Sequence, residues 1–277
     1  MPTADISTVK SADGTVIAYH RAGTGPAIVF LPGAFNDSTT CAPLAEQLQD
    51  RYTVIRPDRR GRGESTDAIG PTAAITYDIR REIEDLDAVI ADIGGSAAVF
   101  GFSSGGILAL RAAVAGSHIT RLALYEPPFA LAGLSGHLPQ RLPERLAELI
   151  ARGERGAAVE LMQLEGIGLP AELIAQAKRS PIWPQLEAIA QTVVYDAAIC
   201  RPPNVPTPDM ARLDLETLVI SSPESWPGVR TAAEALPSHL AHARYVDVPG
   251  GADHGIPAEA TAKVLDAFLS EDRHRNR

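Results

Sequence analysis

Residues 97–106 read AAVFGFSSGG, and this stretch decides how the chain around it folds. The six residues 97–102 form an apolar run of the kind found in a buried strand, and GILALRAAVAG at 106–116 reads as a helix. Between them stand two serines flanked by glycines. Small residues are needed where a strand turns sharply into a helix, because the backbones approach closely there. The stretch therefore predicts a tight strand-to-helix turn centred on Ser103.

The turn Gly101-Phe102-Ser103-Ser104-Gly105 fits the pattern G-x-S-x-G, with Ser103 in the centre. Between a strand and a helix, this pattern is typical of a nucleophile held at strained backbone angles. The helix that begins here would direct its free N–H groups and its dipole at negative charge that develops during acyl transfer. Ser103 is therefore the candidate nucleophile, and Ser104 a backbone N–H donor whose hydroxyl plays no part. The alternative is a serine that only caps the helix.

Strand-like and helix-like segments alternate on both sides of this turn. Strands that are buried on both faces and separated by helices imply an α/β fold with a mostly parallel central sheet flanked by helices. An early segment, 15–23, has the alternation of an antiparallel strand. The other expected strands are 27–33, 52–58, 97–102, 119–128, 216–221 and 243–250, and the expected helices are 41–50, 77–94, 106–116, 228–240 and 258–272.

Residues 131–212 break this rhythm. They hold amphipathic stretches such as 142–153, 157–166 and 184–196, which are cut by prolines and contain no convincing strand. The segment ends in the proline-rich run RPPNVPTPD at 201–209. We therefore predict a core built from residues 1–130 and 213–277, and a helical cap, residues 131–212, that is inserted after the strand 119–128 and selects the substrate.

The composition narrows the class of partner. A formal net charge of -9 and a pI of about 5.3 disfavour nucleic acid, because an acidic surface repels phosphate, and the arginines at 56–62 are too local to reverse this. The first residues lack the features of a signal peptide, and no apolar stretch approaches the roughly 18 residues of a membrane span. The two cysteines lack metal-ligand spacing and are expected to be reduced thiols. We expect a cytoplasmic protein with neither a membrane nor a nucleic-acid partner.

Three further segments give the chain a resemblance to the α/β-hydrolase superfamily. FLPGAF at 30–35 resembles the family's oxyanion segment, PDRRGRGES at 57–65 its Asp-x-Arg/Pro-Gly-x-Gly-x-Ser loop, and PGGADHG at 249–255 its histidine loop. The resemblance implies the α/β-hydrolase fold, a second oxyanion N–H from Ala34, and an architectural role for the loop that contains Asp58. Pro32 replaces the family's usual histidine, which is not a chemical participant.

The resemblance also implies the partners of the serine, which needs a base and a group that orients this base. His254, in a glycine-rich loop, stands where the family has its base. Most members carry an aspartate after the strand 216–221, but here Ser225 occupies that position. Haloalkane dehalogenases and some lactone hydrolases place the acid one strand earlier, where this chain has Glu126. Glu126 is the preferred acid, since a glutamate near a buried strand end is costly without a role. The alternatives that stay open are Glu224, Asp247, Asp253 or no acid at all.

The predicted activity is that of a serine hydrolase which cleaves a carboxylic ester or lactone through an acyl-enzyme, with no metal or organic cofactor. The serine excludes the aspartate-nucleophile chemistry of haloalkane dehalogenases and epoxide hydrolases. The same three residues would also serve a carbon–carbon bond hydrolase or a haloperoxidase-like enzyme. The departures at Pro32 and Ser225 leave open a non-catalytic ligand-binding or signalling protein. The expected partner is the small-molecule substrate, and a homodimer stays open.

Substrate selection is expected in the cap, above the serine. Trp183, between prolines in SPIWPQ, would make a wall for a flat or cyclic substrate, or would simply pack the cap onto the core. The scarcity of charge at the chosen positions predicts an uncharged, moderately apolar substrate. The residues expected to contact it are Phe35, Phe129, Leu131, Met162, Trp183 and Tyr195.

Overall fold

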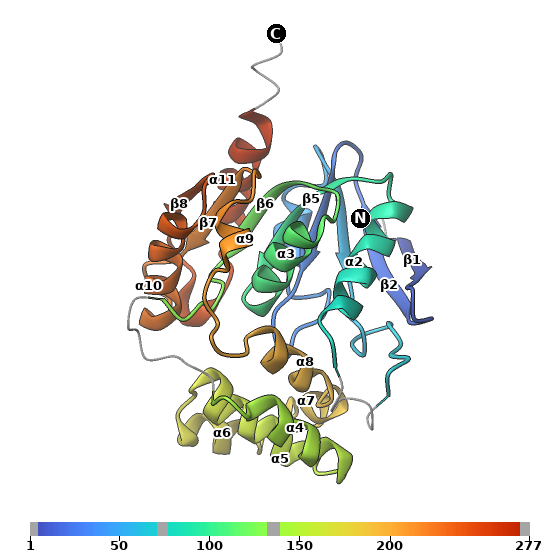
Figure 1. The fold of residues 1–277 in the computed structure, drawn as a ribbon, viewed down its shortest axis with the longest axis vertical. Helices are drawn as coiled ribbons and strands as arrows, with labels where there is room; N and C mark the ends of the chain where they lie inside the picture. Colours follow the sequence, from blue (N-terminus) through green and yellow to red (C-terminus); the bar gives the residue numbers. More distant parts are fainter. Residues whose placement is uncertain (1–4, 71–76, 132–138, 272–277) are drawn as a thin grey trace.

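A computed structural model describes residues 5–70, 77–131 and 139–271. Its centre is one eight-stranded sheet in the order β1-β2-β4-β3-β5-β6-β7-β8 (Figure 1). The pairs β1–β2 and β2–β4 are antiparallel, and the other pairs are parallel. This is the mostly parallel α/β fold that the sequence predicts. The strands are β1 (Asp5–Lys10), β2 (Val16–Ala22), β3 (Ala27–Leu31), β4 (Thr53–Pro57), β5 (Ala97–Phe102), β6 (Ile119–Tyr125), β7 (Thr217–Ser221) and β8 (Ala243–Asp247).

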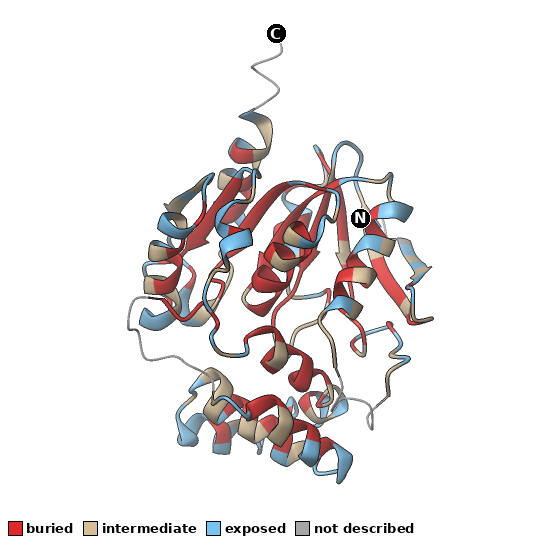
Figure 2. Ribbon diagram, viewed as in Figure 1, coloured by how far each residue is buried: buried red, intermediate tan, exposed pale blue. Residues whose placement is uncertain are grey.

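Helices cover both faces of the sheet because its central strands are apolar on both sides. In β5, Val99 packs in the cluster that contains α2 (Arg80–Asp92), α3 (Ser104–Ala115) and α10 (Pro227–Ala235). Phe100 belongs to the opposite cluster, with α1 (Ala42–Glu46) and α11 (Ala258–Ser270). Strand β5 is buried along its whole length, as Figure 2 shows for the centre of the sheet. Two short 3-10 helices, η3 (Leu236–His239) and η4 (Ala252–His254), flank β8.

Strand β1 is absent from the sequence-based expectation. Its sequence DISTVK alternates but carries few apolar residues, which is typical of an edge strand paired on one side only. Its partner β2 has the antiparallel orientation that the sequence predicts.

The described helices between β6 and β7 lie beyond one end of the sheet, except the last of them, which packs beside α3 (Figure 1). Two expected helices are divided. The stretch 157–166 spans α5 and a π-helix, and the stretch 184–196 spans α7 and α8. Residues 132–138 of the predicted cap lie outside the described residues. The elements are α4 (Leu142–Ala151), α5 (Arg155–Leu161), the π-helix η2 (Met162–Ile167), α6 (Ala171–Ala177), α7 (Trp183–Ala188), α8 (Thr192–Ile199) and α9 (Pro208–Ala211).

Within residues 5–70, 77–131 and 139–271, no helix combines the length and the apolar character needed to cross a membrane.

Candidate active site

Ser103 is the residue between β5 and α3, and its backbone is strained. Its φ of 54° and ψ of -126° are rarely adopted by an L-residue. The turn is tight because α3 starts directly against the end of β3. A Cβ on Gly105 would lie 2.5 Å from the carbonyl oxygen of Leu31 and 2.6 Å from that of Pro32. A Cβ on Gly33 would lie 2.8 Å from the Cβ of Ser103. Glycine at these two places lets the serine meet the segment that follows β3.

Glu126 follows β6, the strand next to β5. Phe102 pairs with Tyr125 across the two strands, so the residues that follow them, Ser103 and Glu126, leave the same edge of the sheet. The Ser103 N–H donates to the Tyr125 carbonyl at 2.9 Å, which ties the serine to the strand that carries the glutamate. Glu126 also has a positive φ, 48°, and its side chain is fully buried.

The carboxylate of Glu126 accepts four hydrogen bonds. Oε1 accepts from the Ser221 hydroxyl at 2.8 Å and the Ser222 N–H at 3.0 Å. Oε2 lies 2.7 Å from the Ser225 hydroxyl and 2.5 Å from Nδ1 of His254. Burial alone would raise the pKa of Glu126, but the bonds from His254, the Ser222 N–H and Ser225 outweigh burial and lower this pKa. Because an ionised carboxylate only accepts, Nδ1 of His254 carries the proton in this pair and Nε2 is left as the basic nitrogen.

Two of the other carboxylates considered for the acid, Glu224 and Asp247, bind elsewhere. Glu224 accepts from the Ser222 hydroxyl at 2.6 Å and from the Gly250 N–H at 3.1 Å. Asp247 accepts from the Tyr245 hydroxyl at 2.6 Å. In the described part of the chain, His254 forms an ion pair with Glu126 and with no other acid.

His254, at the end of η4, lies beside two aromatic rings. Its ring stacks on Trp226, with the ring centres 5.2 Å apart, and lies 4.8 Å from the ring centre of Phe102. The Tyr125 hydroxyl donates to the carbonyl of Gly255 at 2.8 Å and fixes the loop after the histidine.

Backbone strain gathers in the loops around this serine, histidine and glutamate. Among the described residues, five that are not glycine have a positive φ, and all five lie in these loops. Strained angles of this kind cluster at active sites, where the surrounding structure holds them in place. The five residues are Phe35, Ser103, Glu126, Asp253 and His254.

The two N–H groups expected to bind an oxyanion belong to residues that line one cavity with Ser103. Ser104 is the first residue of α3, so no carbonyl of the helix can accept from its N–H. Ala34 follows Gly33, which abuts Ser103. The hydroxyl of Ser104, for which the sequence suggested no part, is engaged: it donates to Asp196 at 2.8 Å.

Ser103 and His254 share a cavity of about 430 Å³ under the helical segment. Its walls are mostly apolar, and they also include the polar residues Asn36, Thr40 and Asp196. The thiol of Cys200 also lies in the wall, but burial raises its pKa to about 12, so it is not a competing nucleophile. The apolar part of the lining is Ala34, Phe102, Pro128, Met162, Ile167, Trp226, Val229 and Ile256.

Of the six residues expected to contact the substrate, Met162 alone is among the described residues that line this cavity. Phe129 lines a neighbouring cavity on the side of α10. Trp183 is buried among the helices between β6 and β7, where its indole N–H donates to Glu187. The Tyr195 ring stacks on Tyr77, and its hydroxyl donates to Asp67 at 2.5 Å. Trp183 and Tyr195 were expected at the substrate because they lie in the predicted cap, but they pack inside this helical segment or against residues outside it. The other two, Phe35 and Leu131, are likewise outside the described lining of this cavity.

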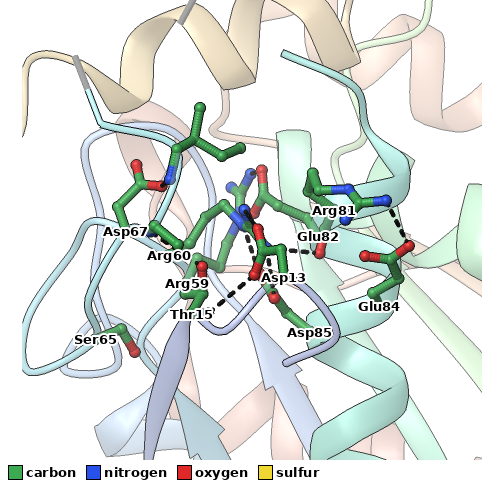
Figure 3. A network of polar contacts seen from close by, with 12 residues as sticks. Asp13, Thr15, Arg59, Arg60, Ser65, Asp67, Arg81, Glu82, Glu84 and Asp85 are labelled. Carbon is green, nitrogen blue, oxygen red and sulfur yellow. Dashed lines mark hydrogen bonds and ion pairs between the residues drawn. The ribbon is translucent and has the colours of Figure 1, made fainter. Parts of the chain in front are cut away.

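Asp196 was not among the residues expected at the site, and the loop that carries the arginines after β4 was expected to be architectural. Arg59 donates to both oxygens of Glu82 and, at 2.9 Å, to Asp196, and Arg62 donates to Asp196 at 2.6 Å. Arg60 bridges Asp13 and Asp85 in the same region (Figure 3). A single acid in the apolar sequence TVVYDAAI was the available signal, because a buried carboxylate needs buried cations.

In the part of the chain that the structure describes, no three His, Cys, Asp or Glu side chains gather as metal ligands would. The fold and the strand-to-helix serine turn together define a hydrolase of the α/β type. The family model described as "Alpha/beta hydrolase family" matches residues 28–267, and the chain belongs to this family.

Similar proteins support this assignment. The chain is 42% identical to an α/β hydrolase of known structure from Sphaerobacter thermophilus, with a TM-score of 0.85 over 95% of this chain and 100% of the other. It is 27% identical over 150 residues to the uncharacterized hydrolase YraK of Bacillus subtilis, which is 54% of each chain. It is 33% identical over 136 residues to the N-formylmaleamate deformylase of Pseudomonas putida, 48% of this chain and 49% of that protein. The chain thus spans about half the length of these two curated relatives.

Proposed function

We propose that this α/β hydrolase cleaves a carboxylic ester or lactone through an acyl-enzyme on Ser103. The observation that carries the proposal is the pairing of His254 with a buried carboxylate in the cavity that Ser103 also lines. Nδ1 of His254 lies 2.5 Å from the buried carboxylate of Glu126, and His254 and Ser103 line one cavity. A base oriented by a carboxylate beside a strained serine is the arrangement that activates a hydroxyl for acyl transfer.

The proposed reaction begins and ends with the free hydroxyl of Ser103. Nε2 of His254 takes the proton of the Ser103 hydroxyl as its oxygen attacks the ester carbonyl, and the Glu126 carboxylate stabilises the imidazolium that forms. The N–H groups of Ala34 and Ser104 hold the negative oxygen of the tetrahedral intermediate. His254 then returns the proton to the leaving alcohol. A water that is deprotonated by His254 attacks the acyl-enzyme, releases the acid and restores the serine.

The cavity supports a small, uncharged substrate. Its volume of about 430 Å³ suits a compact molecule, and its apolar walls favour carbon-rich groups on either side of the ester. Among the described residues of the wall, Asp196 is the one carboxylate, and it is already paired with Arg59 and Arg62, so it offers little attraction to a cationic group.

A specific likeness favours one second candidate, the hydrolysis of an N-formyl amide. The 33% identity to N-formylmaleamate deformylase covers 136 residues. The serine oxygen would attack a formyl carbon as it attacks an ester carbon, with the same base and the same N–H groups. A substrate panel should therefore include p-nitrophenyl acetate, a small lactone and a simple N-formyl amide.

The test compares the wild-type protein with Ser103→Ala. We expect the wild type to hydrolyse p-nitrophenyl acetate, with an initial burst if deacylation is slow, and to be labelled by a fluorophosphonate on Ser103, as mass spectrometry of the peptides would show. Ser103→Ala should lose both the turnover and the label while keeping the wild-type melting temperature within a few degrees. Equal inactivity of the two proteins and no label on Ser103 would favour a ligand-binding protein on a hydrolase fold.

A further inference from the structure

Asp196 is a buried carboxylate that joins the helical cap to the core at the catalytic cavity. It lies on α8, its side chain is fully buried, and it belongs to the cavity wall. Oδ1 accepts from the Ser104 hydroxyl at 2.8 Å and from Arg59 at 2.9 Å, and Oδ2 accepts from Arg62 at 2.6 Å. A carboxylate is retained in such a place only when its charge is matched and its lone pairs are used, and both conditions are met here.

The same two guanidinium groups reach the segment that follows β3. Arg59 donates to the carbonyl of Pro32 at 3.1 Å, and Arg62 donates to the carbonyl of Gly33 at 2.7 Å. The Gly33 carbonyl and the Ala34 N–H belong to one planar peptide unit, so a bond that fixes the oxygen also fixes the direction of the N–H on the opposite side. A cation on the carbonyl further polarises this unit and strengthens its N–H as a donor.

The other oxyanion donor is held from the same carboxylate. Ser104 contributes its N–H to the proposed oxyanion hole, and its hydroxyl is bonded to Asp196. Asp196 therefore binds Ser104, one donor residue, directly. It is connected to the peptide that carries the other donor, the Ala34 N–H, through Arg62. Two guanidiniums and two carboxylates, Asp196 and Glu82, balance in charge, so the cluster places the donors without adding a net charge beside the oxyanion.

We propose that Asp196 is a positioning residue for the oxyanion hole: through Ser104, Arg59 and Arg62 it sets the distance and direction of both N–H donors. This role rests on the proposed acyl transfer at Ser103. Because the donors matter most when the carbonyl oxygen becomes negative, loss of Asp196 lowers kcat and leaves KM nearly unchanged. Removal of a whole donor costs about 10²–10³ in kcat, so a loosened pair should cost about 10–100-fold.

Asp196→Asn tests the proposal, since it keeps the shape and removes the charge. We expect kcat for p-nitrophenyl acetate to fall about 10–100-fold with KM within about threefold, and phenylboronic acid, which forms a tetrahedral adduct with the serine, to bind more weakly by a similar factor. Asp85→Asn is the matched control: it breaks a buried arginine pair of the same network that does not reach residues 32–36, and it should keep the wild-type kcat.

Ser104→Ala provides a second variant, because it removes the hydroxyl bond to Asp196 and keeps the N–H; we expect a fall in kcat of about 3–10-fold. This inference is overturned, and the proposed function is not, if the wild type is active and Asp196→Asn has an unchanged kcat. If Asp196→Asn does not fold, an unchanged kcat in Ser104→Ala has the same meaning. An equal loss in Asp85→Asn also overturns it, since a general loss of packing would then be the cause. A wild type that neither turns over the ester nor binds phenylboronic acid, with Ser103 unlabelled, overturns the proposed function and this inference with it.

Discussion

Replacement of Glu126 by Gln tests the proposed role of this carboxylate, which is to orient His254 and stabilise its charged form. The substitution keeps the size of the side chain and removes its charge. The amide oxygen can still accept from Ser221 and the Ser222 N–H, as Oε1 does now. The amide nitrogen then faces Nδ1 of His254 and, as a donor, favours the imidazole form whose proton is on Nε2. That form cannot take the proton of Ser103.

The size of the effect follows from the pair itself. Two unit charges about 4 Å apart in an effective dielectric of about 20 attract by about 4 kcal/mol, and this stabilisation of the imidazolium is lost with the charge. The environment screens little, because the side chain of Glu126 is 0% exposed and that of His254 is 12% exposed. About 4 kcal/mol corresponds to a fall of roughly 10³ in kcat, with KM nearly unchanged because substrate binding does not use the acid.

The assay is steady-state hydrolysis of p-nitrophenyl acetate by proteins whose melting temperatures have been compared first. Glu224→Gln is the control: this carboxylate lies in the neighbouring loop and binds Ser222 and Gly250, so its loss should leave kcat within about threefold. A Glu126→Gln variant within tenfold of wild type, or a Glu224→Gln variant with the larger loss, would refute the assignment.

Three further predictions concern the packing of the turn, the buried ion pairs and the place of the acid. Gly105→Ala puts a Cβ 2.5 Å from a backbone carbonyl and should lower the free energy of unfolding in urea by about 1–3 kcal/mol. The control Gly228→Ala, on an open helix surface, should leave this free energy unchanged. Equal stabilities of the two variants would contradict the tight turn. Burial alone would raise the pKa of Glu82, but its arginine partner outweighs burial and lowers this pKa to about 2. The ionised Glu82 therefore stabilises the folded protein fully above the unfolded pKa of about 4.3, and this stabilisation is lost as the pH falls toward 2. Glu82→Gln should therefore unfold more easily at pH 7 and show a shallower loss of stability below pH 4; parallel pH profiles would disprove this. Because the Ser225 hydroxyl lies 2.7 Å from Oε2 of Glu126, Glu126→Ala with Ser225→Asp should recover at least tenfold of the kcat lost in Glu126→Ala, and no recovery would show that the loop cannot carry the acid.

The strands and the serine turn were predictable because their signals are local. The apolar run 97–102, the glycines and the alternation of strands with helices each depend on residues close in sequence, and they place Ser103 at a strand-to-helix turn as the structure does. The edge strand β1 was missed because its polar sequence is stabilised by one partner strand and not by burial on both faces.

The walls of the cavity were not predictable in the same way. Whether an aromatic residue in a helical cap faces the substrate or the interior depends on how each helix is rotated, and no local pattern fixes this rotation. Trp183 and Tyr195 therefore pack away from the cavity, while Trp226, from the loop after β7, stacks on His254. Asp196 and Arg59 are 137 residues apart in sequence, so their pairing is a product of the tertiary structure alone.

The five residues with a positive φ around the site should make their loops open before the sheet when the protein is heated. Each strained backbone costs on the order of 1–3 kcal/mol, and a whole domain is stable by only about 5–15 kcal/mol. The loops that carry Ser103, Glu126 and His254 can therefore gain by relaxing while the sheet beneath them stays paired, since local opening requires less free energy than global unfolding. On slow heating, activity should disappear at a lower temperature than the helical signal, and an inhibitor bound covalently to the serine should bring the two temperatures together.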